Sequence, residues 1–487
     1  MELPLTEYLP PFLERQGERF AEPEEIAACG RWVDVHAKHA DAGGPPLLCG
    51  PQGLLVSDSD IHALVFGSTG SMKTRRVIMI QVWTLLQHGE NMIVSDLKSE
   101  LYGCFAPELR RRGYQVLVLN LRNPACGSRW NPLSAAWDFW HAGHHSKAVE
   151  YIRDLAQVLF AELSVRTKDV FWGYAAMDYF TGLALYLCEM APRAQTTMEN
   201  VAVLAAEMER PAGGKTFGAL LLHSLPPEDP AGRYLAGTLD APEGTRTSIL
   251  SEMRQPLSLF TGQDALNDML SDTDIDFFSL KDKPTAIFLI APDEKKTLHP
   301  ILTAFISQTY LRMIEIACLP ECGGKLPIRT NFVLDEFGNL PPLDDINSRL
   351  TASRSRNIRF MLVAQGLSQL YCCYGESATE NILGNCDCLY YLHSRDWVLL
   401  EKLSRLCGTA VSPHTHEASP LVSTSMLQHF SRDEGETLLL LERERPFITH
   451  LPDISAYGLP LGQAAPPAPR RPGPPRTLFS ARRALRL

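Results

Sequence analysis

One short segment of the sequence combines the residue types that bind phosphate. Residues 67–74 read Gly-Ser-Thr-Gly-Ser-Met-Lys-Thr and follow a short apolar run. This spacing matches the phosphate-loop pattern G-x-x-x-x-G-K-[ST], except that Met72 replaces the second glycine. In such loops, successive backbone N–H groups and the N-terminus of the following helix bind phosphate oxygens. The segment therefore predicts a site for ATP and Mg²⁺.

The residues of this loop have different expected roles. Lys73 would neutralise the β- and γ-phosphates, and the Thr74 hydroxyl would bind Mg²⁺. Met72 lies where the backbone approaches the phosphates closely, so its long side chain either crowds the nucleotide or points away from it. Nucleotide binding is expected, whereas hydrolysis stays open because of Met72. The residues predicted to contact the nucleotide are Gly67, Ser68, Thr69, Gly70, Ser71, Met72, Lys73 and Thr74.

A second motif lies far downstream. Residues 331–338 read Asn-Phe-Val-Leu-Asp-Glu-Phe-Gly, an apolar strand that ends in two carboxylates. In phosphate-loop ATPases this arrangement places the Asp beside Mg²⁺ and the Glu beside the attacking water. The alternative is an ordinary strand end that turns into solvent. Together with the phosphate loop, the motif predicts Asp335 as a metal ligand with Thr74, and Glu336 as a catalytic residue with Lys73.

Polar residues around the next predicted strand extend the same hypothesis. Gln365 follows the strand at 359–363, where it either senses the γ-phosphate or is a satisfied strand terminus. Arg354 and Arg356 precede that strand. They are candidates for an arginine finger that reaches a neighbouring subunit's nucleotide, for contacts with DNA phosphates, or for a solvated helix face.

Composition limits the classes of protein to consider. The chain has 487 residues, of which 45% are apolar and 21% charged, which excludes a mostly disordered, collagen-like or coiled-coil chain. The formal net charge is -10, so a nucleic-acid site would have to be a local basic patch. No cysteine pair has C-x-x-C spacing, and neither a signal peptide nor a transmembrane segment is recognisable. These features predict a cytoplasmic globular protein.

The elements around the two motifs indicate an α/β protein. Strands alternate with helices near the phosphate loop, which is typical of a parallel sheet with covered faces. Helical patterns with hardly any strand then run for roughly 110 residues before the strands resume. The predicted strands are 62–66, 92–95, 115–121, 285–290, 331–334, 359–363 and 388–392. The predicted hairpin pairs 437–442 with 446–450.

This alternation defines the expected domains. An N-terminal arm precedes a nucleotide-binding domain built from two stretches, with an all-α domain inserted between them. The C-terminal tail has six arginines and no acidic residue, so we expect it to be disordered. The boundaries are 1–55 for the arm, 56–140 and 262–460 for the nucleotide-binding domain, 141–261 for the insertion and 461–487 for the tail.

Several segments, taken together and in this order, resemble TraG-type coupling proteins, the ATPases of conjugative type IV secretion. The similarity covers roughly residues 55–455 and is strongest to the branch found on Gram-positive mobile elements. The segments are HALVFGSTGSMKTRR, IVSDLKSELYG, RWNPL, PTAIFLIAPDEKKTLHPILTAFISQTYLRMI, NFVLDEFGNLPPL, SRSRNIRFMLVAQGLSQL and GETLLLLERERPF.

The resemblance implies more than the residue pattern does. It implies a RecA-like P-loop NTPase domain with an inserted all-α domain, assembly into a homo-hexamer, and ATP-driven export of relaxase-bound single-stranded DNA through a type IV secretion channel. The sequence departs from the family at Met72, at Ser99, where the family has glycine, and in showing no pair of N-terminal membrane helices. Either a membrane-anchored partner subunit recruits the chain to the inner face of the cell membrane, or the chain is a soluble or decaying relative of the family.

Three functions remain in competition at this point. The first is the coupling ATPase itself. The second is a catalytically weak adaptor of the same fold, which would bind relaxase or effector proteins through its α domain. Met72 favours the adaptor, whereas Lys73, Thr74, Asp335, Glu336 and Gln365 favour the enzyme. The third is a DNA-pumping ATPase outside secretion, and the family-like segments argue against it.

Overall fold

The computed structural model describes residues 18–166, 171–411, 418–441, 443–471, 473 and 475–484. The first residues of the predicted arm lie outside these ranges. Among the described residues, no helix is both long enough and apolar enough to cross a membrane.

Among the described residues, the sheet that carries the phosphate loop has nine strands, in the order β16-β15-β12-β4-β11-β10-β5-β9-β6. The central strands β12, β4, β11 and β10 pair in parallel, whereas β15 pairs antiparallel with both β12 and β16. The strand bounds are β4 Ala63–Phe66, β5 Asn91–Ser95, β6 Gln115–Asn120, β9 Thr285–Ile290, β10 Thr330–Leu334, β11 Ile358–Ala364, β12 Cys388–Tyr391, β15 Glu436–Leu441 and β16 Phe447–His450.

The predicted strands and the predicted hairpin are therefore present, with bounds that differ by a few residues. Every residue of β4, β10 and β11 is buried. Such continuous apolar burial is expected for parallel strands whose two faces are both covered by other elements. The carboxyl ends of these three neighbouring strands lie at one edge of the sheet, and the site described below is built there.

The chain divides into two compact units, which we describe separately. The first unit comprises residues 1–92, 328–338 and 347–461. It contains the phosphate loop, strands β4, β10, β11, β12, β15 and β16, and a small antiparallel sheet. That sheet has the order β1-β3-β2, formed by β1 Arg31–Val33, β2 Pro46–Gly50 and β3 Gly53–Val56. Strand β2 contacts the edge strand β16 and so covers part of that edge.

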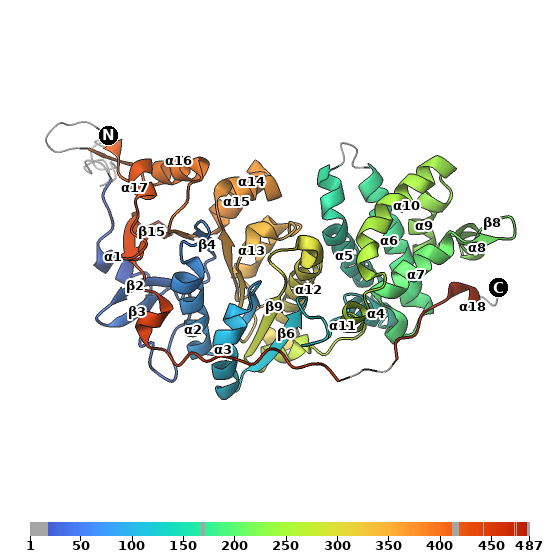
Figure 1. Cartoon of the computed structure of the whole chain (residues 1–487), viewed down its shortest axis with the longest axis horizontal. Helices are drawn as coiled ribbons and strands as arrows, with labels where there is room; N and C mark the ends of the chain where they lie inside the picture. The colour runs from blue at the N-terminus through green and yellow to red at the C-terminus, as the bar shows by residue number, and fades with distance from the viewer. Residues whose placement is uncertain are drawn as a thin grey trace, which may run out of the picture. The chain divides into compact units, whose positions relative to one another are not determined.

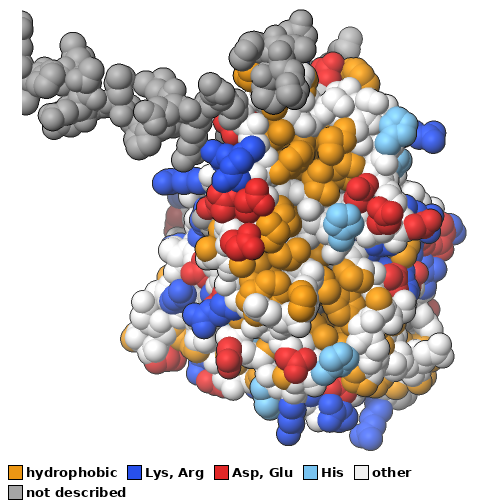
Figure 2. Space-filling model, turned by 90° about the vertical axis from the view of Figure 1, so that its left-hand side faces the viewer, with side chains coloured by type: hydrophobic (Ala, Val, Ile, Leu, Met, Phe, Trp, Pro, Cys, Tyr) orange, Lys and Arg blue, Asp and Glu red, His pale blue; other side chains and the backbone are white. Residues whose placement is uncertain are grey.

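Helices η3 and α2 follow β4, α13 follows β10, α14 follows β11 and α16 follows β12 (Figure 1). Figure 2 shows the face of this unit near β2 and β15, where apolar side chains form a band bordered by charged ones. The helix bounds are α1 Pro23–Ala27, η3 Thr74–Ile78, α2 Met79–His88, α13 Ile346–Arg354, α14 Leu367–Tyr374, α15 Glu376–Asn385, α16 Trp397–Leu406 and α17 Thr424–Gln428.

The second unit comprises residues 93–327, 339–346 and 462–487 and is rich in helix. Helix α6 is buried along much of its length, because its apolar residues pack against α5, α9 and α10. The helix bounds are α3 Glu100–Arg111, α4 Ser134–His141, α5 His145–Arg166, α6 Phe171–Met190, α7 Met198–Met208, α8 Phe217–Ser224, α9 Pro230–Leu239, α10 Glu243–Leu257, α11 Asp264–Met269 and α12 His299–Ala317.

The C-terminal segment, which the sequence predicts to be disordered, makes defined contacts over its described residues. Gly462 donates its backbone N–H to the carbonyl of Cys104, and Arg470 forms an ion pair with Asp268 at 2.7 Å. Further along, Phe479 is buried. The prediction rested on a run of arginines without acids nearby in sequence, whereas the acids that pair with them come from distant parts of the second unit.

Candidate nucleotide-binding site

The phosphate loop connects β4 to the helical turn η3 and keeps the backbone shape that its sequence pattern requires. Met72 has φ 70°, in the left-handed region that favours glycine. A non-glycine residue there costs about 1–2 kcal/mol. Arg432 donates a hydrogen bond to the Met72 sulfur, with Nη2 and Sδ 3.7 Å apart. The Met72 side chain therefore extends toward residue 432, and the loop retains its glycine-like conformation.

Lys73 lies across this loop and is almost completely buried. Its Nζ donates to the carbonyl oxygens of Gly67 at 2.5 Å and Ser68 at 3.2 Å. A side chain at position 67 would not fit, because a Cβ there would lie 2.4 Å from the Ser71 Oγ and 2.9 Å from the Lys73 Cγ. The glycine at the start of the motif thus gives the lysine room to cross the loop.

The two predicted metal ligands are brought together across the sheet. The Thr74 hydroxyl donates to Asp335 Oδ2 at 3.0 Å, and the Glu336 N–H donates to Asp335 Oδ1 at 2.9 Å. Burial of the carboxyl group, and then the charge of Glu336, raise the pKa of Asp335 to about 6. The nearby Lys73 charge acts in the opposite direction. A hydroxyl and a carboxylate oxygen in contact are the hard donors that suit Mg²⁺.

Glu336 and Gln365 also meet, although they follow different strands. Gln365 Nε2 donates to Glu336 Oε2 at 3.1 Å. Glu336 has φ 56°, a left-handed conformation that is uncommon outside glycine and is enriched at functional sites. The ends of β4, β11 and β10 thus gather Lys73, Thr74, Asp335, Glu336 and Gln365 at one edge of the sheet.

The two predicted arginines do not join this cluster within the chain. Arg354 forms an ion pair with Asp387 at 2.7 Å, and Arg356 Nη1 donates to the Ala352 carbonyl at 2.7 Å. Both precede β11, whereas Gln365 follows it, and seven residues of strand correspond to about 20 Å. The arginines therefore lie at the opposite edge of the sheet from the phosphate loop.

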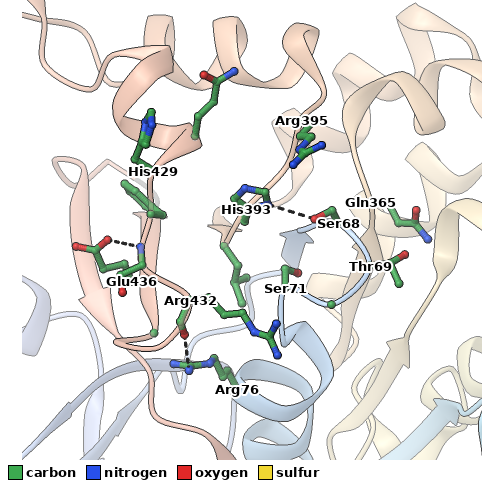
Figure 3. A pocket seen from close by; sticks show the side chains of 16 residues that line it. Ser68, Thr69, Ser71, Arg76, Gln365, His393, Arg395, His429, Arg432 and Glu436 are labelled. Atoms are coloured by element: carbon green, nitrogen blue, oxygen red, sulfur yellow. Dashed lines mark hydrogen bonds between the residues drawn. The ribbon is translucent and has the colours of Figure 1, made fainter.

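A cavity of about 670 Å³ opens beside the phosphate loop, within the first unit. Figure 3 shows the loop residues on one side of it, and on the other side residues from the segments that follow β12 and α17. Ser68 Oγ and His393 Nδ1 approach to 3.3 Å across one wall. The polar side chains that line the cavity are those of Ser68, Thr69, Ser71, Arg76, Gln365, His393, Arg395, Gln428, His429, Ser431, Arg432 and Glu436.

Arg76 holds two walls of this cavity together. Its buried guanidinium donates to the carbonyl oxygens of Arg432 at 2.6 Å and Leu451 at 2.7 Å. Gly435 has φ 74°, and a Cβ there would collide with Arg76 Nη1. The sequence gives little warning of these residues, because residues 428–436 reach the phosphate loop only through the pairing of β15 with β12. A glycine beside several charged residues was the one available signal.

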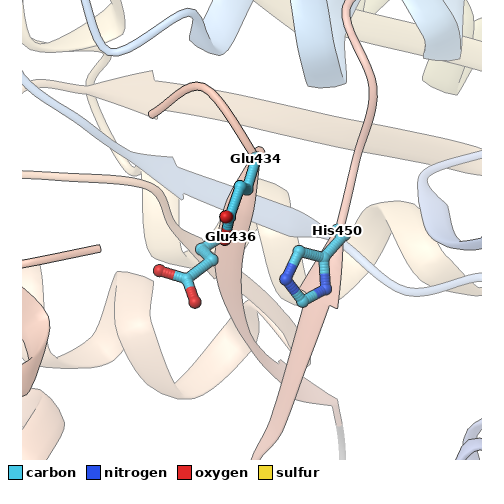
Figure 4. Close-up of side chains that lie close together, drawn as sticks. All are labelled: Glu434, Glu436 and His450. Atoms are coloured by element: carbon cyan, nitrogen blue, oxygen red, sulfur yellow. The ribbon is translucent and has the colours of Figure 1, made fainter. Parts of the chain in front are cut away.

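Glu434, Glu436 and His450 form a small cluster near this cavity that the sequence did not reveal (Figure 4). Their ligand atoms lie within 4.8 Å of one another, close enough to hold a divalent cation. The register of the hairpin explains this proximity, because Glu436 and His450 are directly opposite on β15 and β16. Glu436 also accepts the Ser431 N–H at 2.6 Å. All three side chains are exposed or half-exposed, so the cluster is not an enclosed metal site.

Comparison with known proteins places this site in context. The family model for type IV secretory system conjugative DNA transfer matches residues 28–440. A conjugal transfer protein TraG of Escherichia coli is 25% identical over 405 residues, which are 80% of this chain and 60% of TraG. A VirD4 protein of Rhizobium radiobacter is 28% identical over 183 residues, covering 36% of this chain and 25% of VirD4. The chain spans about 60% of the length of that TraG relative.

Solved structures show the same fold. The coupling protein TrwB, solved without its first 70 residues, has a TM-score of 0.66 at 16% identity and covers 93% of this chain and 95% of its own. TrwB bound to ADP and Mg²⁺ has a TM-score of 0.65 at 17% identity, with 94% and 96% covered. The predicted RecA-like P-loop NTPase fold with a helical domain is therefore confirmed.

Proposed function

Because the chain belongs to the family of type IV secretory system conjugative DNA-transfer proteins, we propose that it is the coupling ATPase of such a system. It would recruit relaxase-bound single-stranded DNA to the secretion channel and move that DNA with energy from ATP hydrolysis. One observation carries the proposal: Lys73, Thr74, Asp335, Glu336 and Gln365 converge at the carboxyl ends of three adjacent strands.

The phosphate loop supplies the nucleotide-binding part of this function. Its N–H groups and Lys73 would hold the β- and γ-phosphates, and Thr74 with Asp335 would hold Mg²⁺. Mg²⁺ would neutralise the charge that develops on the phosphate oxygens. The complexes of the related TrwB with the ATP analogue ADPNP and with ADP and Mg²⁺ support this assignment. The adjoining cavity has room for the nucleoside.

Glu336 and Gln365 would carry the hydrolytic part. Glu336 would orient a water molecule and accept its proton. Gln365 donates to Glu336 and so holds the carboxylate in one orientation. An amide in that place can exchange this contact for one with the γ-phosphate, which would make Gln365 a sensor of the bound nucleotide.

The alternative function, a catalytically weak adaptor, is favoured by the replacement of the loop glycine by Met72. The left-handed conformation at Met72 argues for the enzyme, because the loop keeps its phosphate-binding shape despite the substitution. The side chain extends toward Arg432, which lines the cavity beside the loop.

The test is ATP turnover by the purified full chain, with and without single-stranded DNA. We expect turnover that rises with DNA and with protein concentration, because a homo-hexamer would complete each site from a neighbour. Lys73→Ala removes the contact with the ground-state phosphates, so it should abolish nucleotide binding. Equal ATP affinity of the wild type and Lys73→Ala would refute the site. A wild-type protein that binds ATP but does not hydrolyse it, with or without DNA, would favour the adaptor.

Arg354 and Arg356 would act between subunits, through the nucleotide or through DNA. An arginine supplied in trans is worth roughly 10³–10⁵ in rate. Mixing inactive Lys73→Ala protein with an inactive Arg356→Ala protein should then restore some turnover, because a mixed ring pairs an intact pocket with an intact arginine. Absence of rescue at every ratio, with full activity of a proven monomer, would leave the arginines as DNA contacts or a solvated face. The channel components and a membrane-anchored subunit remain the proposed partners.

A further inference from the structure

The residues that follow β12 contact the nucleotide site at two places, both within the first unit. Strand β12 pairs in parallel with β4, so its carboxyl end lies beside the phosphate loop. There the carbonyl oxygen of His393 accepts the Ser68 N–H at 2.7 Å. Figure 3 shows His393 and Arg395 at the cavity beside that loop. Asp396, the next residue of the segment, contacts the turn that follows β11.

The carboxylate of Asp396 holds this turn. Its Oδ2 accepts the Ser368 N–H at 2.7 Å, and its Oδ1 accepts the Ser368 hydroxyl at 2.8 Å. Gly366 makes this close approach possible, because a Cβ at that position would lie 2.5 Å from Asp396 Oδ2. The backbone of Gly366 is extended, with φ −172°, so the glycine supplies space and not an unusual conformation. The turn after Gln365 is therefore shaped around this carboxylate.

The main chain of Gln365 is held on both sides by the same group of residues. Its carbonyl oxygen accepts the Ser394 hydroxyl at 3.2 Å, and Ser394 Oγ accepts the Asp396 N–H at 3.1 Å. The Gln365 N–H donates to Oε1 of Gln369, in the first turn of α14, at 2.9 Å. Because both main-chain groups of Gln365 are fixed, its side chain starts from a defined position when Nε2 reaches Glu336.

Asp396 also caps the N-terminus of α16, but that role does not account for all of its contacts. Its Oδ1 accepts the Val398 N–H at 3.1 Å, as the side chain of a helix N-cap does. One carboxylate oxygen is enough for this cap. The bond between Oδ2 and the Ser368 N–H serves the turn after Gln365 instead.

We propose that Asp396 is a positioning residue of the nucleotide site, which acts through Gln365 and does not touch the nucleotide. By fixing the turn after β11, it keeps Gln365 Nε2 aimed at Glu336 and within reach of the γ-phosphate. This inference rests on the proposed function, in which Gln365 senses the bound nucleotide. Accurate placement has a large effect, because a displacement of about 1 Å can cost about 10²-fold in rate.

Two variants weaken the contact with the turn in different ways. Ser368→Ala removes one hydroxyl and leaves the cap of α16 intact. Asp396→Asn keeps a capping oxygen, since asparagine caps helices as well as aspartate does. If that oxygen stays at the cap, the new NH₂ group lies opposite the Ser368 N–H and cannot accept from it. We expect kcat to fall by about 10–100-fold in Asp396→Asn and by less in Ser368→Ala, with the affinity for ADP unchanged in both.

Calorimetric titration with ADP and with ADPNP, each with Mg²⁺, tests the inference without hydrolysis. The wild type should bind ADPNP more tightly than ADP. Gln365→Ala should reduce this preference by about tenfold, the effect of one hydrogen bond to a charged group. Asp396→Asn and Ser368→Ala should reduce the preference in the same direction. In the Gln365→Ala background, Asp396→Asn should cause no further loss, because both residues act through one contact.

Asp229→Asn is the matched control. Asp229 caps α9 in the second unit, a helix of the same length as α16, and accepts the Gly232 N–H at 2.6 Å. This variant should leave turnover and both affinities unchanged. It therefore separates the loss of a carboxylate at a helix cap from the loss of the contact with Ser368.

The possible results distinguish this inference from the proposed function. A wild-type preference for ADPNP in both Asp396→Asn and Ser368→Ala would overturn the inference and leave the proposed function standing. So would a further loss from Asp396→Asn in the Gln365→Ala background, since Asp396 would then act by another route. Equal affinity of the wild type for ADP and ADPNP would overturn it as well, because Gln365 would sense no γ-phosphate. Absence of nucleotide binding by the wild type would instead refute the proposed function, and this inference with it.

Discussion

The amino ends and the carboxyl ends of the central strands in the first unit are both polar, but they are built differently. At the amino ends of β10 and β11, Arg359 and Glu90 are 2% and 3% exposed and pair at 2.5 Å. Asn331 bonds to both of them, at 2.9 Å and 2.7 Å. At the carboxyl ends, Asp335 and Glu336 are half-buried and contact Thr74 and Gln365.

The amino ends of these strands serve stability, whereas the carboxyl ends serve binding and chemistry. Burial alone would raise the pKa of Glu90, but the Arg359 charge and hydrogen bonds from His88 and Asn331 lower it, so the amino-end network is charged and mutually satisfied. The carboxyl end instead places Met72 and Glu336 in left-handed conformations. Strained backbone and half-buried acids are retained where they serve binding or chemistry. We therefore expect substitutions at the two edges to change different properties.

The largest expected effect is on stability at the amino end. Glu90→Ala should lower the free energy of unfolding by about 3–5 kcal/mol, because it leaves the buried Arg359 charge without its partner. Denaturant unfolding of the full chain measures this. The double variant Glu90→Ala, Arg359→Met should recover part of the loss, and a single variant as stable as the wild type would contradict the assigned network.

At the carboxyl end the loss should be in turnover. Glu336→Gln should reduce ATP hydrolysis by about 10²–10³-fold, since removal of a positioned base typically has that effect. ATP affinity and the unfolding midpoint should stay close to those of the wild type, because the amide keeps the size of the side chain. Calorimetric titration with ATP, together with steady-state hydrolysis, checks both. Loss of binding in this variant would mean that Glu336 is structural, like Glu90.

The sequence predicts the carboxyl edge far better than the amino edge. The phosphate loop and the Asp335–Glu336 pair are local motifs that end apolar runs, and adjacent parallel strands bring such ends together. Arg359 instead belongs to a run of arginines that suggests a charged surface, and its partner Glu90 is 269 residues away. The position of residues 428–436 in the cavity wall is equally hard to predict from the sequence, because it depends on the antiparallel pairing of β15 with β12.

The third prediction concerns pH and again the amino edge. His62 accepts the Phe360 N–H on Nδ1 at 3.0 Å, so its Nε2–H donates to the Leu350 carbonyl at 2.8 Å. Burial lowers the pKa of His62 to about 4. The unfolded chain protonates this ring near pH 6.5. Stability from the neutral ring is thus complete above pH 6.5 and falls as the pH drops toward 4, by up to about 1.4 kcal/mol per pH unit.

Denaturant unfolding at intervals between pH 7 and pH 4 measures this slope. His62→Gln carries no titrating ring, so the difference in slope between it and the wild type isolates His62 from the other histidines. Equal slopes in the two proteins would contradict the assignment. ATP affinity should be insensitive to this substitution, because position 62 lies at the amino end of β4 and the phosphate loop follows its carboxyl end.

The smallest effect is expected at Met72, and it sharpens the comparison most. Glycine adopts φ 70° without the penalty of a side chain, so Met72→Gly should relieve about 1–2 kcal/mol of local strain. Glycine also loosens the unfolded chain, which offsets roughly 0.4–1 kcal/mol of that gain. The net gain in unfolding free energy should therefore be small, about 0–1.6 kcal/mol. If the Met72 sulfur also positions Arg432 at the cavity, the glycine variant should bind ATP more weakly than the wild type. If the Met72 side chain instead crowds the phosphates, the glycine variant should bind ATP more tightly. Met72→Ala keeps the backbone penalty and removes the sulfur, so calorimetry on both variants separates the two contributions.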